Sequence, residues 1–222
     1  MTRTQAHRFA AVGTPLGDDK LLLRSFHGSD TLSRPFQYTL SLYSEEGGVK
    51  ADDILGQNIT VRLETPAGDT RYFNGYVSRF VQTRVEGRLF HYQATVVPWL
   101  WLLTRNADCR IFQEKTVPDI VKEIFRDRGF TDFDDSLLTG SYQPREYCVQ
   151  YRETDFNFVS RLMEQEGIYY YFKHEDGKHT LILSDSYSGH ERIAGDPVPY
   201  LPLLFSAGLT PPSPYVIVNH PF

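Results

Sequence analysis

The sequence lacks the motifs that mark most enzyme active sites. It has no GxSxG nucleophile elbow, no Walker loop, no GxGxxG after a strand, and no HExxH or CxxC pair. These patterns place nucleophiles, phosphate-binding loops, dinucleotide-binding turns and metal ligands, so their absence argues against each of those chemistries. We therefore expect a protein that is not an enzyme, with no catalytic, cofactor-binding or metal-ligating residues and no cofactor.

Cysteines and long apolar runs are also scarce. Cys109 and Cys148 are the two cysteines, and their spacing does not suggest a disulfide framework, so we interpret them as ordinary semi-buried thiols. The segment from Met1 to Arg8 does not look like a signal peptide, and no run approaches the roughly 18 apolar residues that span a bilayer. We expect assembly in the cytoplasm, no stable membrane anchoring, and any export to depend on a machine rather than a signal peptide.

Positive charge is in the minority. The net charge of -5 gives no uniform positive field for phosphate backbones, so nucleic acid is not an expected partner. Aromatic residues make up 14% of the chain and are mostly Tyr and Phe, which favour strands. Together with 222 residues, this composition predicts a β-rich α+β protein of one large or two modest domains.

The first half of the chain has the pattern of a small antiparallel β-barrel. Apolar and polar residues alternate with period two, which is typical of strands with one wet face, in 36–43, 58–64, 71–81 and 89–97. Gly75 interrupts the third of these strands and indicates a bulge or a tight bend at a barrel corner. A short helical lid at Trp99–Leu103 ends the unit, so residues 1–103 are expected to form an N-terminal barrel domain.

The next region, residues 104–186, predicts an α/β domain in the order strand, helix, strand, helix, hairpin. Thr116 is a candidate N-cap for the first helix, whose apolar residues recur on one face until Gly129. A strand at 147–151 precedes a second helix that starts at Thr154–Asp155 and stops at Gly167. Strands at 168–174 and 179–183 then form a hairpin.

The last stretch, residues 187–222, is Pro-rich. From Pro197 to Phe222 it has no Asp, Glu, Lys or Arg and contains seven of the 13 prolines. Two interpretations stay open: an extended apolar strap, or a disordered tail left by truncation of a longer protein.

Two groups of polar residues are candidates for metal or acid–base sites. His174 and His179 face each other across the predicted hairpin and would be joined by Glu175 and Asp176, but the favoured interpretation is exposed polar residues at a hairpin tip. Glu164 and Glu166 lie two positions apart on a helix and point in opposite directions, so they are interpreted as solvated charges. Turn and cap roles are likewise favoured over calcium binding for two acidic groups, which are Asp52–Asp53 and Asp132 with Asp134–Asp135.

An aromatic strand at Tyr169–Phe172 is the best candidate for stacking on bases or sugars. Alternation places Tyr169 and Tyr171 on one side, and Tyr170 and Phe172 on the other. The favoured interpretation is burial of both sides, one in the core and one against a neighbour.

Several blocks, in the same order, resemble the VgrG and Rhs-associated Vgr family. The most specific is Glu153–Phe172, with the sequence ETDFNFVSRLMEQEGIYYYF. Further similar blocks are LSRPFQY at 32–38, DILG at 53–56, FNGYV at 73–77 and the region 92–103 with PWLWLL. The resemblance runs from about residue 21 to about residue 185.

The resemblance implies the N-terminal, hub-like region of a type VI secretion spike, with a fold like that of the contractile-phage tail hub. It implies a homotrimer between a stacked hexameric tube protein and a piercing needle, with effector or adaptor proteins as further partners, exported by the contractile machine. The family's second barrel and needle are missing after about Tyr200, so the chain is expected to be truncated. The alternatives are a free-standing ligand- or effector-binding module and a phage baseplate hub or tail protein.

Overall fold

The computed structural model describes residues 3–65 and 68–187. Its first part has six strands and two 3-10 helices: β1 (Ala10–Gly13), β2 (Leu22–Ser29), β3 (Gln37–Ser44), η1 (Ala51–Asp53), β4 (Asn58–Glu64), β5 (Thr70–Glu86), β6 (Leu89–Val97) and η2 (Trp99–Arg105). The second part has two helices and five strands: β7 (Ala107–Phe112), α1 (Val117–Asp127), β8 (Phe133–Leu137), β9 (Cys148–Thr154), α2 (Asp155–Glu166), β10 (Tyr169–Glu175) and β11 (Lys178–Ser184).

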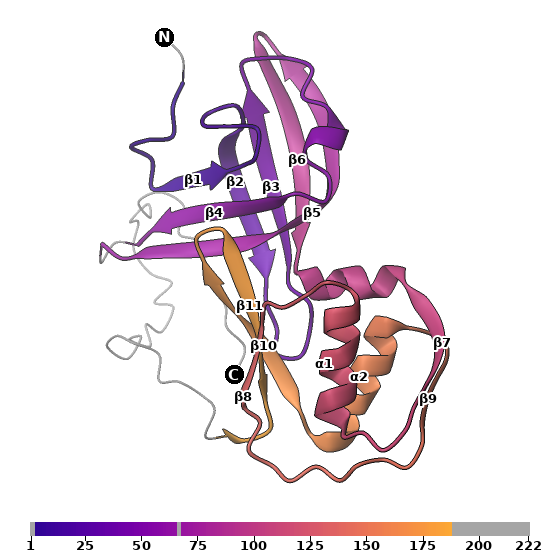
Figure 1. The fold of residues 1–222 in the computed structure, drawn as a ribbon. Coiled ribbons are helices and arrows are strands. Elements are labelled where there is room, and N and C mark those ends of the chain that lie inside the picture. The colour runs from indigo at the N-terminus through magenta and orange to yellow at the C-terminus, as the bar shows by residue number, and fades with distance from the viewer. Residues whose placement is uncertain (1–2, 66–67, 188–222) are drawn as a thin grey trace, which may run out of the picture.

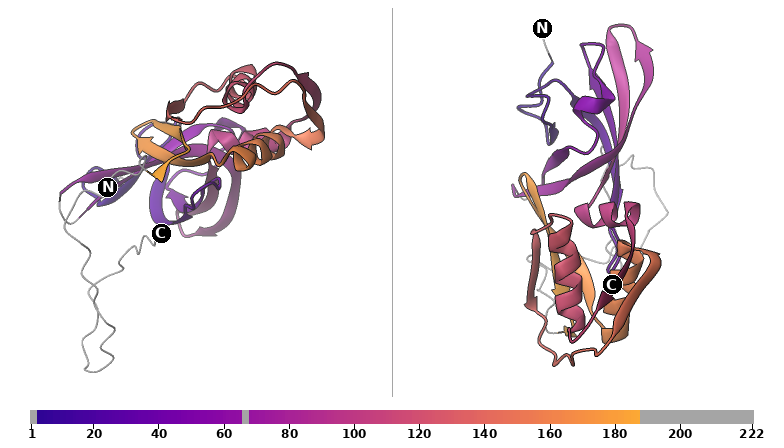
Figure 2. Two further views of the ribbon diagram at one scale, coloured as in Figure 1. Left: turned by 90° about the horizontal axis from the view of Figure 1, so that it is seen from below. Right: turned by 45° about the vertical axis from the view of Figure 1, so that its right-hand side comes forward.

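The first six strands form one antiparallel sheet in the order β1-β4-β5-β6-β3-β2. The sheet curls around an interior, as the left panel of Figure 2 shows from below. Alternate residues such as Leu40, Leu42 and Ala94 point inward and are fully buried. This arrangement and the mixed α/β part after it confirm the predicted fold class.

A side chain closes the seam between β1 and β2, the two ends of the sheet. The Nε2 group of Gln5 donates to the carbonyl oxygens of Val12 and Leu21, at 3.2 Å each. Its Oε1 atom accepts from the backbone N–H groups of Val12 at 3.0 Å and Leu23 at 2.9 Å. Because Val12 lies in β1, Leu21 directly precedes β2 and Leu23 lies in β2, the amide of Gln5 takes the place of a peptide group in a strand ladder.

Strand β5 turns the corner of the barrel at Gly75. Residues up to Tyr76 pair with β4, and residues from Tyr76 onward pair with β6, with a bulge between Val77 and Arg79. A Cβ atom on Gly75 would lie 2.7 Å from the Val96 side chain and 2.8 Å from the Val97 carbonyl oxygen. The predicted bend is therefore confirmed. Glycine is required at this position because β6 lies too close to leave room for a Cβ atom.

The two helices of the second part begin and end where their caps predict. Thr116 and Thr154 accept from the backbone N–H groups of Asp119 and Asn157, so both helices have a side-chain N-cap. Gly167 ends α2 in the left-handed conformation with φ of 72°. The two helices lie side by side in Figure 1, between the ribbon β7–β9 and the hairpin β10–β11.

The element order of this part needs one correction. The sequence indicated strand, helix, strand, helix, hairpin, but β8 adds a strand after α1, pairing in parallel with β11. Its sequence, Phe-Asp-Asp-Ser-Leu, has a low strand propensity, so tertiary pairing rather than local preference makes it a strand.

The hairpin β10–β11 packs against β5 and joins the two parts. One continuous cluster of buried apolar residues runs from Leu40 in the barrel through Trp99 to Phe125 and Phe172. The proposed division at residues 103 and 104 stays a prediction. The proposed Pro-rich tail lies outside the described residues, apart from Tyr187 at its start.

Candidate functional site: a buried junction and an exposed ribbon

His174 and His179 lie opposite each other in the hairpin, as predicted, but they are not exposed polar residues at its tip. They are register partners, and their ring centroids are 6.1 Å apart. His179 is 2% exposed, and the ring of Phe36 lies against both imidazoles. The sequence interpretation was wrong because the hairpin packs on the barrel, which the spacing of the two histidines cannot reveal.

Asn74 of β5 organises this junction. Its Oδ1 atom lies 2.7 Å from Nδ1 of His179, which must donate, and Nε2 of His179 then accepts from the Trp99 N–H at 3.0 Å. The Asn74 N–H donates to Nδ1 of His174 at 3.1 Å, while Nε2 of His174 lies 3.2 Å from the Tyr38 hydroxyl. Each ring nitrogen thus has a partner, and these contacts tie the hairpin to the barrel.

Both histidines are neutral in this arrangement. Burial lowers the pKa of His174 to about 4, and burial together with the neighbouring His174 lowers the pKa of His179 to about 3. A metal ion would need a ring nitrogen that is already hydrogen-bonded. The junction is therefore suited to holding two parts together rather than to binding a ligand.

The acidic candidates lie apart and have turn or surface roles. Asp134 accepts from the Ser136 N–H at 2.8 Å, and Asp135 pairs with Lys122 at 2.9 Å. Further ion pairs and placements are Asp132 with Lys178, Glu166 with Arg145, and Asp52 and Asp53 in the first turn of η1. Within residues 3–65 and 68–187, no three His, Cys, Asp or Glu side chains gather as metal ligands would.

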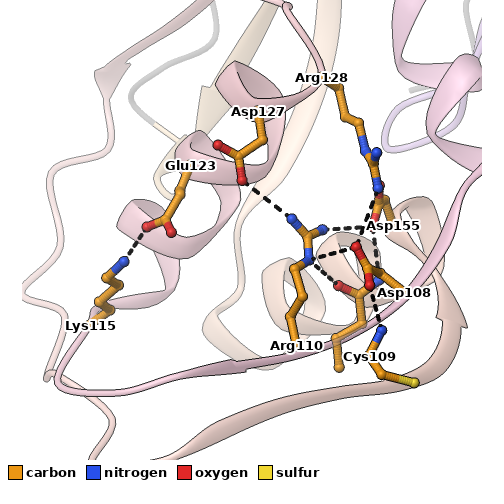
Figure 3. A network of polar contacts seen from close by, with 9 residues as sticks. Asp108, Cys109, Arg110, Lys115, Glu123, Asp127, Arg128 and Asp155 are labelled. Carbon is orange, nitrogen blue, oxygen red and sulfur yellow. Dashed lines mark hydrogen bonds and ion pairs between the residues drawn. The ribbon is translucent and has the colours of Figure 1, made fainter.

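Sequence reasoning missed a buried carboxylate at the start of α2. Asp155 is fully buried, and its Oδ1 atom accepts from Arg110 at 2.7 Å and from Gln150 at 2.8 Å. Its Oδ2 atom accepts from Arg128 at 2.6 Å. Figure 3 shows Arg110 between Asp155 and Asp127, with Arg128 approaching from the end of α1. Asp155 thus connects β7, β9 and both helices.

The two residues before Asp155 complete the clamp. The single Nε–H group of Arg161 is shared between the two carboxylate oxygens of Glu153, at 3.0 and 3.1 Å, and its Nη2 atom donates to the same carboxylate at 2.7 Å. Thr154 caps α2. Each polar group of the Glu153–Asp155 block therefore holds this helix in place. The only sequence signal for the clamp was the resemblance of this block to a family motif.

The aromatic strand alternates as predicted. Tyr170 and Phe172 are buried, at 2% and 7% exposure, while Tyr169 and Tyr171 are half-buried. The Tyr169 hydroxyl donates to the Ser186 carbonyl oxygen at 2.7 Å. The strand therefore offers no open stacking face of the kind that the binding-module alternative requires.

Three exposed large apolar residues lie on the ribbon β7–β9 or directly before β9. Ile111, Tyr147 and Tyr151 are 59%, 57% and 64% exposed. Their neighbour Cys109 is an exposed free thiol, and Cys148, on the inner side, is buried and free. Exposed apolar groups gathered on one element are typical of surfaces that contact another chain. This ribbon is the best candidate for an assembly surface.

A family model described as phage tail baseplate hub (GPD) matches residues 29–208. Type VI secretion system spike proteins VgrG1c and VgrG1a of Pseudomonas aeruginosa are 51% and 50% identical to the chain, over 91% and 89% of its length. The actin cross-linking toxin VgrG1 of Vibrio cholerae is 34% identical over 88% of the chain. The chain spans 28%, 31% and 18% of the length of these three relatives.

A solved structure supports the same relationship. The E. coli c3393 protein, described as a component of the type VI secretion system similar to the T4 bacteriophage tail proteins gp27 and gp5, matches with a TM-score of 0.69 and 30% identity. The match covers 78% of this chain and 51% of that one. A 43 kDa tail protein of prophage MuSo2 from Shewanella oneidensis, at 14% identity and a TM-score of 0.52, shares the fold.

Proposed function

Because the chain belongs to the phage tail baseplate hub (GPD) family, we propose that it forms the hub portion of a type VI secretion spike, between an inner tube and a piercing needle. The observation that carries the proposal is the identity of 50% and 51% to two VgrG spike proteins over nearly the whole chain. The agreement of the fold with the E. coli secretion component supports it.

The role is mechanical. A hub that receives the push of a contracting sheath must keep its parts in fixed relative positions. Two buried polar clusters support this: the Asn74 junction holds the hairpin to the barrel, and the Asp155 clamp holds α2 to β7 and α1. Displacing either part would leave buried polar groups without partners, at a cost of roughly 1–3 kcal/mol each, so both clusters resist sliding.

The segment has no enzymatic part in this proposal. One relative is named as a toxin and two as spike proteins, yet all three match along most of the chain. The name VgrG is common to all three relatives, so we assign the matched segment to the part that they share. A structural role fits that common part.

The proposed partners are two further copies in a homotrimer, a stacked hexameric tube protein, and effector or adaptor proteins. The exposed apolar ribbon of Ile111, Tyr147 and Tyr151 provides one surface for such contacts. Assembly in the cytoplasm followed by export through the contractile machine completes the proposal. In the part of the chain that the structure describes, no helix is long and apolar enough to cross a membrane.

A graft tests the function directly. The matched segment of the P. aeruginosa VgrG1a spike protein is replaced by this chain up to residue 187, and release of the tube protein into the medium is measured. We expect the graft to restore release in a strain that lacks its own spikes. A soluble graft that forms trimers of the expected mass but releases no tube protein would contradict the proposal.

Two variants of the graft serve as controls. Tyr151→Asp places a charge on the exposed ribbon and is expected to weaken assembly, while Val85→Asp changes another exposed apolar residue, in the barrel hairpin, and is expected to leave assembly unchanged. Light scattering across a concentration series reports the mass of each variant. Equal assembly by both would show that the ribbon is not the contact surface.

A further inference from the structure

The Asn74 junction depends on two imidazoles that each accept a hydrogen bond from a backbone N–H group. Nδ1 of His174 accepts from Asn74 at 3.1 Å, and Nε2 of His179 accepts from Trp99 at 3.0 Å. A ring nitrogen that accepts carries no proton, so each ring is held in one tautomer. His174 has its proton on Nε2, 3.2 Å from the Tyr38 hydroxyl. His179 has its proton on Nδ1, 2.7 Å from Oδ1 of Asn74.

A second proton on either ring would turn an acceptor into a donor. On His174 the new N–H group would face the Asn74 N–H group. On His179 it would face the Trp99 N–H group. Backbone N–H groups cannot reverse their role, so each contact would become repulsive. The ring centroids are 6.1 Å apart, so two imidazolium ions would also repel each other. The closed junction therefore requires both rings to be neutral.

Among the described residues, no carboxylate contacts a ring nitrogen to compensate such a proton, because all four nitrogens have the other partners named above. Tyr38 and Tyr76 face the rings from β3 and β5 and are uncharged below pH 7. Trp99 of η2 and Thr60 of β4 do not titrate. The charged residues beside the two histidines in the hairpin are Lys173, Glu175, Asp176 and Lys178, of which Lys178 pairs with Asp132 at 3.2 Å.

The two histidines lie in the tip of the hairpin, residues 173–180. This tip meets the barrel through the imidazole contacts and through the Gly177 N–H, which donates to Oγ1 of Thr60 at 3.1 Å. The inner half of the hairpin, with Tyr170, Leu181 and Leu183, is buried in the core cluster that the two helices share. Acid acts on the imidazole contacts and not on apolar burial, so it weakens the hold on the tip and leaves the inner half in place.

From these observations, we propose that the junction is an acid-operated release, in which protonation of His174 and His179 detaches the hairpin tip from β5 and η2 while the barrel and the helices stay folded. Opening removes both contacts between donors and lets water solvate both cations. The link between the two parts is therefore firm at neutral pH and is lost in acid. The proposal concerns contacts inside one chain, so it does not depend on the hub assignment.

The pH range follows from the titration of the closed form. Burial lowers the pKa of His174 to about 4, and burial together with the neighbouring His174 lowers the pKa of His179 to about 3. Both values lie below the roughly 6.5 of a solvated histidine, so opening takes up protons and becomes easier as the pH falls below about 6.5. Between pH 7 and 5, each histidine raises the opening equilibrium constant about 20-fold, and the two together raise it about 500-fold.

Hydrogen exchange of the full chain, followed by NMR, measures the opening directly, because the N–H groups of Asn74 and Trp99 are the donors to the two rings. We expect their protection, corrected for the intrinsic exchange rate, to fall about 500-fold between pH 7 and 5. At pH 5 it should lie at least about 100-fold below the protection of the slowest amides in the β3–β6 pairing. Equal protection of all these amides would mean that only the whole protein opens, and this result, like unchanged protection of Asn74 and Trp99, would overturn the proposal.

The double variant His174→Asn/His179→Gln removes both titrations and keeps both acceptors, because the amide oxygens can replace Nδ1 and Nε2. Its protection at Asn74 and Trp99 should change less than about threefold between pH 7 and 5, and a persisting 500-fold change would also overturn the proposal. Should this variant not fold, either single substitution should reduce the change to about 20-fold. His27→Gln, at an exposed histidine of β2, is the matched control and should keep the full 500-fold change.

Discussion

The seam of the barrel depends on one side chain, so we predict that Gln5→Met destabilises the protein strongly. Methionine matches glutamine in length and shape but forms none of the four hydrogen bonds that Gln5 makes to Val12, Leu21 and Leu23. The substitution therefore tests the polar contacts without opening a cavity. Gln5 is 6% exposed, so water cannot readily replace its amide.

The size of the effect follows from the backbone groups that lose their partners. The N–H groups of Val12 and Leu23 are the costly ones, since these residues are both 6% exposed, and carbonyl oxygens tolerate a lost partner better. At about 1–2 kcal/mol for each N–H group, the free energy of unfolding should fall by about 3 kcal/mol. That is a large part of the roughly 5–15 kcal/mol that typically stabilises a domain.

Urea unfolding, followed by the fluorescence of the buried Trp99 and the half-buried Trp101, measures this change. Gln82→Met is the matched control, because Gln82 is exposed on β5 and should change the free energy of unfolding by no more than about 0.5 kcal/mol. Separation of β1 from β2 would also uncover two strand edges, so Gln5→Met should associate with rising concentration in light scattering. A loss below about 1 kcal/mol for Gln5→Met would refute the view that its amide closes the barrel.

Three further predictions concern the buried clusters and the barrel corner. Asp155→Asn should lower the free energy of unfolding by about 2–4 kcal/mol in urea titrations, because two arginines lose their buried anion, and parent-like stability would argue against the clamp. Gly75→Ala should cost about 2–4 kcal/mol in the same assay, because the new Cβ meets a backbone oxygen at 2.8 Å, whereas Gly13→Ala, with its nearest contact at 3.8 Å, should be near neutral. The pKa values of His174 and His179, about 4 and 3, lie below the roughly 6.5 of an unfolded chain, so unfolding takes up protons and stability should fall as pH drops from about 7 to 5. We expect a loss of about 2–4 kcal/mol over that interval, and a double substitution of both histidines by Gln should flatten the profile.

The sequence predicted those strands and helices whose limits depend on residues close together in the chain. The strands at 58–64 and 89–97 were predicted with the bounds that β4 and β6 have. The predicted N-cap Thr116, the predicted helix start at Thr154–Asp155 and the predicted stop at Gly167 agree with the structure, because capping is a contact between residues three or four positions apart. Strand β8, with two consecutive aspartates, had no such signal, since its partner β11 lies more than 40 residues further along the chain.

The buried clusters could not be predicted for the same reason. Asp155 reaches Arg110 across 45 positions, and His179 reaches Asn74 across 105. A carboxylate at a helix start suggests a partner for the helix dipole, and a histidine near a hairpin turn suggests an exposed side chain. Only the pairing of distant elements shows that both are internal.

The block that best identifies the family begins with three residues whose side chains are all engaged internally. Glu153 binds Arg161, Thr154 caps α2, and Asp155 binds Arg110 and Arg128. An active-site motif would instead leave a nucleophile, an acid or a base directed at a substrate. A component that carries load has the opposite requirement, because every unsatisfied buried group is a place where the structure yields at lower cost. Glu153, Thr154 and Asp155 therefore form a joint between the helices and the β7–β9 ribbon, which suits the proposed mechanical role.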